Sequence, residues 1–432
     1  MQNSPHRWLA LAVVALAACN ASGGEVSASN NASDLDHLTL EVADQLFREH
    51  SRELLAAKRA VESAEADKVI AAQRPNPTLS AAVSSLSASN WSAGSNFQNK
   101  PIDTGIQLSQ LIERGNKRQL RTEAAQNNLA ASRSDQQDVL RQQTLAMRDA
   151  FYDLSLAQER AHVSEETLGL FRRSVDAAEL RLKSGDIAAS DLSRLKVDAL
   201  RAENDVRQAR ADREKAQLVL AYFLGLEASA ARIRTDGEWP AVTSVPQSKS
   251  IEDAIDARAD VRAARERFEA AKKSRDLARA ARTHDVTVGV QYDHFPTQVT
   301  NNTFGVSVSV PLFVFYQFDG EIKKAEVAVN SAEEDLQRVR ALARADIARS
   351  RADLESAQER VQRYTGSLLK EAQKAADAAE YAYKRGAVGV TDLLDARRTL
   401  YATRLDAAAA QADYAKALAA WQAAIGADAI RT

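Results

Sequence analysis

The chain has 432 residues, and its 57 basic and 59 acidic side chains nearly cancel, which argues against a nucleic-acid or other polyanionic partner. Glycine and proline are sparse, at 16 and 8 residues, while Ala, Leu, Arg, Glu, Asp and Gln are abundant. This composition is typical of long helices. No run of 18 apolar residues follows the N-terminal segment, so we expect no transmembrane helix.

The N-terminus has the pattern of a secretory signal with a lipidation site. Arg7 is a short basic region, Trp8–Leu16 is apolar but too short to span a membrane, and Cys19 follows Leu-Ala-Ala. This pattern resembles the lipobox of bacterial lipoproteins, whose cysteine is acylated. We predict a signal peptide over residues 1–18 and a lipidated tether over 19–37. The alternative is an ordinary signal peptide with an incidental cysteine, and a single cysteine forms no disulfide within the chain.

The first half of the chain predicts a helix, a β-hairpin and two more helices. Helical spacing predicts a helix over 38–73, which ends at two prolines. Two alternating stretches separated by a polar loop predict a hairpin over about 78–111. The proline-free segment 117–184 predicts a rod of roughly 100 Å. Gly185 breaks this rod, and a further helix is expected over 190–224.

The second half repeats this order. Helical segments are expected over 251–281, 321–385 and 391–425, and a hairpin over about 286–315. At a constant offset of 201 residues and without a gap, identical residues recur in the two halves (Gly185 and Gly386, Asp191 and Asp392, Gly225 and Gly426). Such self-similarity indicates a duplicated structural unit.

The duplication divides the chain into repeats. We assign the first repeat to residues 38–226, with its tip near Gly185, and the second repeat to 251–426, with its tip near Gly386. Residues 227–250 contain two prolines and are assigned to a linker, and 427–432 to a C-terminal tail.

The predicted strands have one apolar face and one small, polar face. In residues 303–313, bulky apolar side chains alternate with glycine and serine (Phe304, Val306, Val308 and Val310 against Gly305, Ser307 and Ser309). This alternation and the strand length are typical of transmembrane β-strands. Aromatic residues cluster beyond one end, like half of an interfacial girdle (Phe313, Phe315, Tyr316 and Phe318). The alternative is a half-buried hairpin of a soluble sheet. Four strands cannot close a membrane barrel, so strands that face lipid require an oligomer.

Three short motifs follow the order of the duplicated elements: QRPNPTL at 73–79, LIERGNKR at 111–118 and YKRGAVGVTDLLDARRTLY at 383–401. With the duplication, they make nearly the whole mature chain resemble the TolC-like outer-membrane efflux ducts. The resemblance implies a mainly α fold with a pair of β-hairpins. It further implies a homotrimer that forms a twelve-stranded outer-membrane β-barrel, continued by a long periplasmic α-helical barrel with an equatorial collar.

Within the family, the chain is most similar to the ducts of cobalt–zinc–cadmium and cobalt–nickel exporters. This similarity implies a passive exit duct for divalent cations. The implied partners are outer-membrane lipid, a periplasmic membrane-fusion adaptor and an inner-membrane pump of the resistance-nodulation-division type. Two alternatives stay open: the same duct serving drugs or a secreted polypeptide, and a periplasmic coiled-coil scaffold that never enters the membrane.

The sequence carries no local pattern of catalysis or of tight metal binding. The six histidines are not paired at helical spacing, and no cysteine accompanies them. We therefore predict that the chain is not an enzyme and has no cofactor. His284 and His294 share a hairpin with Asp285 and Asp293, which leaves open a weak metal contact beside the reading of strand-end polar residues.

The second tip carries the candidate aperture. Asp392 and Asp395 are three residues apart on one helical face, and the resemblance implies that they ring the periplasmic opening. It also implies that Tyr383 helps to latch the closed opening, whereas Val388 stands where related ducts carry a basic latch residue. Asp392 is also a candidate N-cap of the last helix, with Thr391 competing.

Both tips are predicted to dock the adaptor, because they lie a full rod length from the hairpins at the breaks between paired helices. The expected contact residues are Gly185, Asp191, Gly386 and Val390.

Overall fold

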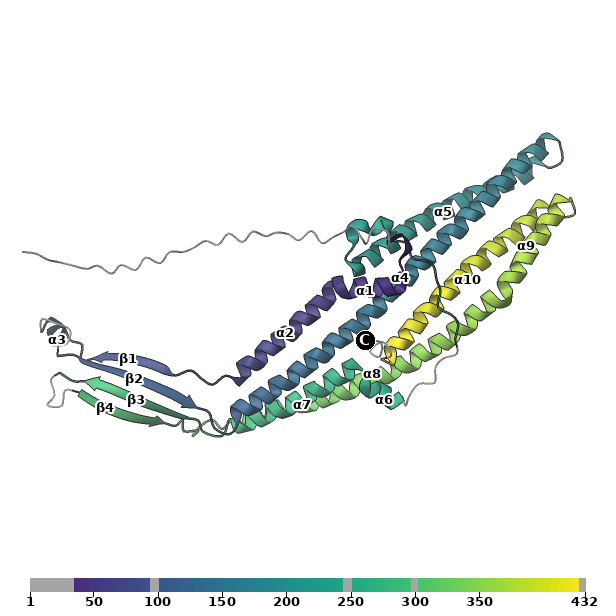
Figure 1. The fold of residues 1–432 in the computed structure, drawn as a ribbon. Helices are drawn as coiled ribbons and strands as arrows, with labels where there is room; N and C mark the ends of the chain where they lie inside the picture. Colours follow the sequence, from purple (N-terminus) through teal and green to yellow (C-terminus); the bar gives the residue numbers. More distant parts are fainter. Residues whose placement is uncertain (1–34, 94–100, 244–250, 297–301, 427–432) are drawn as a thin grey trace, which may run out of the picture.

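The computed structural model describes residues 35–93, 101–243, 251–296 and 302–426. The predicted signal peptide, Cys19 and the C-terminal tail lie outside the described residues. The molecule is a long rod with a small β-sheet at one end and, at the other end, two turns that each connect a pair of helices (Figure 1). The predicted fold class, mainly α with a pair of β-hairpins in a duplicated chain, is confirmed.

The first repeat has two short helices before its hairpin where one was expected. A 3-10 turn (Leu35–His37) precedes α1 (Leu40–His50) and α2 (Arg52–Ala72). The expected helix over 38–73 is interrupted at Ser51, whose hydroxyl accepts a hydrogen bond from the Leu54 amide at 3.4 Å and caps α2. The remaining helices of the repeat are α3 (Ala88–Ser92), α4 (Lys117–Lys183) and α5 (Ala189–Leu224), and a 3-10 helix follows (Glu227–Arg232).

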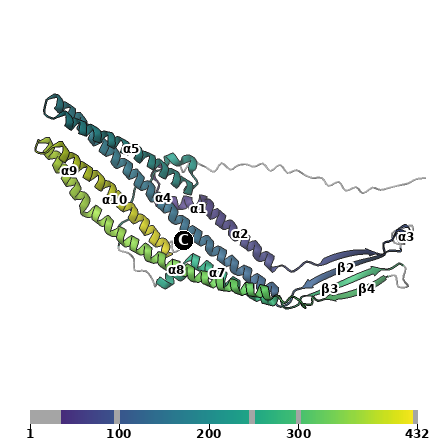
Figure 2. The ribbon, with the colours of Figure 1, turned by 180° about the vertical axis from the view of Figure 1, so that it is seen from behind.

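The second repeat has the same order with two further interruptions. Its helices are α6 (Ile251–Ala257), α7 (Ala259–Ala280), α8 (Asp319–Arg363), α9 (Leu369–Lys384) and α10 (Val390–Ala424). A π-helical turn (Tyr364–Leu368) joins α8 to α9, so the expected rod over 321–385 contains a bulge. Because such a turn inserts an extra residue without ending the helix, the rod curves and continues (Figure 2).

The two hairpins form a single antiparallel sheet. Its strands are β1 (Thr78–Ser84), β2 (Asp103–Ile112), β3 (Val286–His294) and β4 (Asn302–Ser309), in the order β1-β2-β3-β4. The two repeats meet in the sheet at β2 and β3, where Leu108 is opposite Val290. Strands β1 and β4 are therefore the two edges.

The helical core is a string of clusters along the rod. Helix α4 packs against α2, α5, α7 and α10, and α8 packs against α7 and α10. Phe47, Met147 and Leu220 are completely buried in the middle of the rod. Many buried side chains of α10 are small, among them Ala410, Ala412 and Ala415, which lets long helices approach closely.

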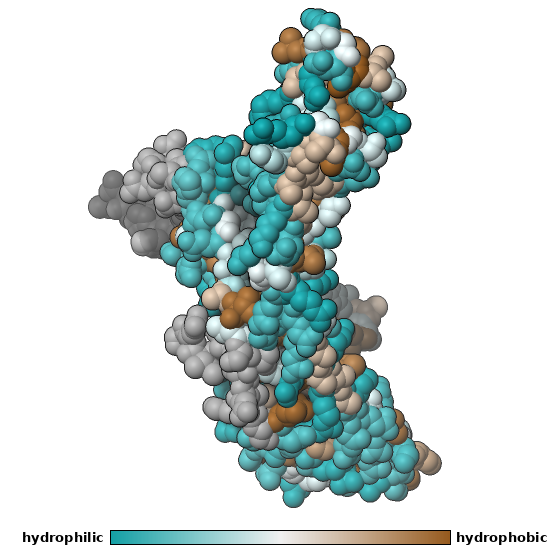
Figure 3. Space-filling view, turned by 90° about the vertical axis from the view of Figure 1, so that its right-hand side faces the viewer, coloured by the Kyte–Doolittle hydropathy of each residue, from teal (hydrophilic) through white to brown (hydrophobic). Residues whose placement is uncertain are grey.

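One face of the molecule is mostly polar. Figure 3 shows one face on which hydrophilic residues dominate and apolar residues form separate small patches. Within the described residues, none of the helices combines the length and the apolar character that crossing a membrane would need.

Candidate functional site

Each helical hairpin ends in the same turn, and both turns lie at the end of the rod away from the sheet (Figure 1). Gly185 follows α4 and Gly386 follows α9, with φ values of +83° and +72°. In each turn the amide after the glycine donates to the carbonyl five residues earlier, at 2.8 Å in the first and 2.9 Å in the second. This is a Schellman cap, in which glycine adopts the left-handed conformation without Cβ strain.

An aspartate occupies the third position of the helix after each turn. Asp191 lies there in α5 and Asp392 in α10. The Gly389 amide donates to Oδ2 of Asp392 at 3.3 Å. Gly389 is therefore the N-cap residue, so the prediction of Asp392 or Thr391 at the N-cap position was wrong, although the Asp392 side chain caps the helix from its third position. The carboxylate of Asp392 instead lies beside the positive end of the helix dipole.

Asp395 belongs to a chain of charges that joins the two repeats. Oδ1 of Asp395 lies 3.4 Å from Nη1 of Arg398, whose Nη2 donates to both carboxylate oxygens of Asp198 on α5 at 2.7 and 2.8 Å. The Asp198 side chain is 5% exposed, and the Asp395 side chain is 65% exposed. The hydrogen bonds from Arg398 to Asp198 raise the pKa of Arg398 above its usual value. The buried ion pair between Arg398 and Asp198 fixes α10 to α5, and Asp395 lies at the exposed end of this network of charges.

Tyr383 and Val390 also contact the first repeat. The guanidinium carbon of Arg181 lies 5.1 Å from the centre of the Tyr383 ring, a cation–π geometry. The Val390 side chain is 5% exposed and packs in a cluster with Leu192 and Leu394, against which Tyr383 is half-buried. The tip of the second repeat is thus held against the tip of the first.

The predicted adaptor-contact residues differ in exposure. Gly185 and Gly386 are exposed at the turns, and Asp191 is partly exposed beside them. Val390 presents its side chain to the core cluster and not to solvent. Among the four residues, the exposed ones are those available to a partner.

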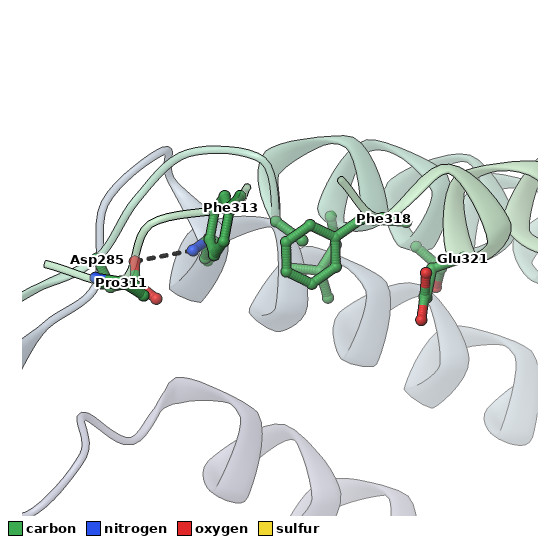
Figure 4. A pocket seen from close by; sticks show the side chains of 10 residues that line it. Asp285, Pro311, Phe313, Phe318 and Glu321 are labelled. Carbon is green, nitrogen blue, oxygen red and sulfur yellow. Dashed lines mark ion pairs between the residues drawn. The ribbon is translucent and has the colours of Figure 1, made fainter. Parts of the chain in front are cut away.

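At the opposite end of the helices, the sheet meets α4, α7 and α8 at a cavity of about 590 Å³ (Figure 4). Asp285 pairs with Lys117 at 2.8 Å beside it, and both side chains are largely buried. Phe313 and Phe318 line the cavity and contact each other edge to face at 5.0 Å. The sequence analysis assigned these two rings to an interfacial aromatic girdle, whereas in the structure they pack against the helix ends.

The two hairpin histidines lie at opposite ends of β3. His284, before the strand, stacks on Phe313 at 4.3 Å, and His294, at its far end, lies 2.8 Å from Oδ1 of Asn302. They therefore do not form one site. Across the described ranges, no group of three or more His, Cys, Asp or Glu side chains is arranged to hold a metal ion.

Comparison with known proteins gives the family. The model of the outer membrane efflux protein family matches residues 44–226 and 250–427. The cobalt-zinc-cadmium resistance protein CzcC of Cupriavidus metallidurans is 26% identical over 370 residues, which cover 85% of each chain. The probable outer membrane lipoprotein SilC of Salmonella typhimurium is 24% identical over 82% of this chain and 78% of its own. The pyoverdine export outer membrane protein OpmQ of Pseudomonas putida is 23% identical over 91% and 86%.

Solved structures show the same fold at low sequence identity. The outer membrane protein VceC of Vibrio cholerae superposes with a TM-score of 0.75 at 20% identity, covering 90% of this chain and 96% of its own. A structure of CusC gives a TM-score of 0.74 at 18% identity, over 89% and 91% of the two chains. Because the family model matches both repeats and spans most of the chain, this protein belongs to the outer membrane efflux protein family.

Proposed function

We propose that the protein is the passive exit duct of a tripartite exporter for divalent heavy-metal cations such as Co²⁺, Zn²⁺, Cd²⁺ or Ni²⁺. In this proposal a homotrimer spans the outer membrane, and a periplasmic adaptor links it to an inner-membrane pump of the resistance-nodulation-division type. Similarity to CzcC, which is named for cobalt-zinc-cadmium resistance, supports the metal cargo. OpmQ is named for pyoverdine export, and it favours the second candidate, the same duct for larger molecules.

The unclosed sheet is the observation that carries the proposal. The outer edges of β1 and β4 have no partner strand in this sheet, and such edges are templates for pairing with another chain. On one face, Val306 and Phe304 are 76% and 85% exposed, while the other face carries Gln107, Ser307 and similar polar residues. Pairing β4 of one copy with β1 of the next closes three sheets into a barrel that is apolar outside and polar inside.

The tips have two roles in the proposal. Asp392 and Asp395 of three copies form acidic rings at the periplasmic aperture, and Tyr383 helps to hold its closed state. Gly185, Asp191 and Gly386 contact the adaptor, and Val390 supports that contact from within the core cluster. The part of the chain that the structure describes holds no cluster of metal ligands, which suits a duct because an ion that binds too well does not leave.

Lipidation of Cys19 is proposed as a second attachment to the outer membrane. It is supported by the lipobox-like sequence and by similarity to SilC, which is named as a probable lipoprotein. Incorporation of labelled palmitate into the wild-type protein but not into Cys19→Ser tests this part.

Deletion of the gene tests the cargo. If the duct exports metals, the deletion strain becomes sensitive to Co²⁺, Zn²⁺, Cd²⁺ or Ni²⁺ and keeps its tolerance of drugs and detergents. The reverse pattern would establish the second candidate. The molecular mass of the detergent-extracted protein, with heat-dependent migration on a gel, tests the trimeric barrel, and a monomer that stays in the aqueous fraction would contradict it.

A further inference from the structure

Three glycines lie on the polar face of the sheet. The register places Gly105 opposite Asp293, Gly305 opposite Gln291, and Gly289 between Ser109 and Ser307. All of these residues share one face, because direct cross-strand partners point to the same side of a sheet. The polar face is therefore a mixture of glycines and longer polar side chains.

Each glycine lies beneath a side chain of a neighbouring strand. A Cβ atom at Gly289 would be 2.6 Å from Oγ of Ser307 and 3.0 Å from Nε2 of Gln107, and one at Gly305 would be 2.9 Å from Cγ of Gln291. A Cβ at Gly105 would collide with the carboxylate of Asp293. None of the three has a positive φ, so the sequence needs glycine here for space and not for backbone conformation.

The covering amides lie flat along the sheet and are held there. Nε2 of Gln107, on β2, passes over Gly289 of β3 and donates to Oγ of Ser307 on β4 at 3.2 Å. Nε2 of Gln291 donates to Oδ2 of Asp293 at 3.1 Å. Gly289 is buried and both glutamines are half-buried, and the atoms nearest to a Cβ at Gly289 belong to Ser307 and Gln107. The burial comes from side chains that lie down on the backbone.

We propose that Gly105, Gly289 and Gly305, the luminal glycines, set the bore of the outer-membrane section by letting Gln107, Gln291 and Asp293 lie against its wall. This inference rests on the proposed function, in which the polar face lines the lumen of a trimeric barrel. With a Cβ at Gly289, the amide of Gln107 loses its path to Ser307 and turns into the lumen, once in each chain. At the level of Gln107 and Ser307 the wall carries amides and hydroxyls, and the carboxylate of Asp293 lies beside them, one same-face position further along β3 than Gln291. Substitution of Gly289 therefore changes the bore without removing a charge.

The test uses the full-length protein in a planar bilayer. Neutral polymers of graded mass are added from the extracellular side, and the largest mass that still enters and lowers the conductance is recorded. Gly289→Ala should shift this cut-off to smaller polymers and leave cation selectivity unchanged. The double variant Gly289→Ala/Gln107→Ala should return the cut-off to the wild-type value or above it, because the long side chain that turned inward is gone and only the short Ser307 hydroxyl remains beside the new methyl group.

A matched control separates this effect from added bulk alone. Ser84→Thr adds one methyl group on the same face of β1, opposite Asp103 and away from Gln107 and the luminal glycines, and should leave the cut-off unchanged. Gly305→Ala, with and without Gln291→Ala, repeats the test at an independent glycine if Gly289→Ala does not fold. An unchanged cut-off in the glycine variants, or a narrowed one that removal of the glutamine does not restore, overturns the inference. A wild-type protein that forms no channel contradicts the proposed function instead.

Discussion

Asp392 and Asp395 have different surroundings although they are one helical turn apart. The described hydrogen-bond partner of Asp392 is the Gly389 amide of its own helix, and among the described residues no ion pair to Asp392 is found. Asp395 lies near Arg398, which is already engaged by the buried Asp198. Because Arg398 is shared with Asp198, its guanidinium offsets the negative charge of Asp395 only in part. Both remain available to form the proposed acidic rings.

The variant Asp392→Asn/Asp395→Asn should lose cation selectivity and lose block by divalent cations in single-channel recordings. Two carboxylates per chain are removed, and like charges at close range repel by on the order of 1 kcal/mol per pair in a partly solvated pore. The matched control is Asp191→Asn, which removes the aspartate from the same position in the first repeat. Unchanged selectivity in the double variant, or an equal loss in the control, would place the constriction elsewhere.

Asp149 provides a pH dependence in the middle of the rod. Burial raises the pKa of Asp149 to about 6, Lys416 of α10 opposes the shift, and Asp153 adds to it. Lys416 also pairs with Asp153. A carboxyl group whose pKa is raised by folding destabilises the fold when it is charged. This cost is absent below the unfolded pKa near 3.8 and is complete above about pH 6.

Asp149→Asn should therefore stabilise the protein at pH 7 and lose that advantage as the pH falls toward 4. The expected gain at pH 7 is roughly 1–2 kcal/mol, after allowance for solvent screening of a partly exposed carboxylate. Denaturant unfolding of the two proteins at a series of pH values measures the difference. A difference that stays constant between pH 4 and pH 7 would show that Asp149 does not titrate in this range.

At the scale of elements, the segment after β4 separates into two sets of side chains. Phe313 and Phe318 pack at the helix junction (Figure 4), whereas Leu312 and Phe315 are 80% and 100% exposed. Along β4, Phe304, Val306 and Val308 form an exposed apolar row, and Leu312 and Phe315 continue it beyond the end of the strand. Since this row faces lipid in the proposed barrel, the exposed residues should lie at the periplasmic boundary of the membrane, where aromatic side chains are favoured.

A photoreactive benzoylphenylalanine at Phe315 should form adducts with phospholipid in cells. The same residue at Phe313, which is stacked on His284, should crosslink within its own chain and is the control. Lipid adducts appear by mass spectrometry, and crosslinks between chains appear as a dimer on a gel. A dimer in place of lipid adducts at Phe315 would mean that a neighbouring copy covers this segment.

The sequence predicted the order and type of the elements because their signals are local. Strict alternation marked β3 and β4, and a glycine between two long apolar stripes marked each tip. The break at Ser51 and the π-helical turn at Tyr364–Leu368 were missed, since neither contains a proline and both preserve helical spacing on either side. The pairing of Arg398 with Asp198 could not be foreseen, because it depends on how two distant helices pack.

The covering of the luminal glycines was also missed, although a signal was present. The single glycine inside each of β2, β3 and β4 could have suggested close approach of neighbouring side chains. The side chains that cover them could not be identified without the register, which pairs strands about 180 residues apart in the chain. Local sequence patterns do not predict long-range strand pairing of this kind.

At the scale of the whole molecule, the length of the segment after Cys19 limits how a lipid anchor and a membrane-inserted barrel can form in the same chain. The first described residue, Leu35, lies beside the middle of the rod, where Leu38 bridges to Thr235. From there α1 and α2 run toward the sheet with 11 and 21 residues, a distance of roughly 50 Å at 1.5 Å per residue (Figure 1). The 16 residues from Cys19 to Leu35 can span at most about 55 Å. Reaching the periplasmic surface of the membrane would use nearly all of that length.

Deletion of residues 22–29 should therefore prevent a lipidated chain from inserting its hairpins. The deletion shortens the maximum reach by about 27 Å, so an acyl chain in the membrane and a barrel in the membrane can no longer form together. We expect fewer heat-modifiable trimers in the outer membrane, measured by gel migration of membrane fractions. Replacing the same residues with glycine and serine at equal length should have no effect. Adding Cys19→Ser to the deletion should restore trimers, because an unlipidated N-terminus places no limit on the hairpins. Normal trimers in the lipidated deletion variant would contradict the anchoring geometry and leave the barrel itself untouched.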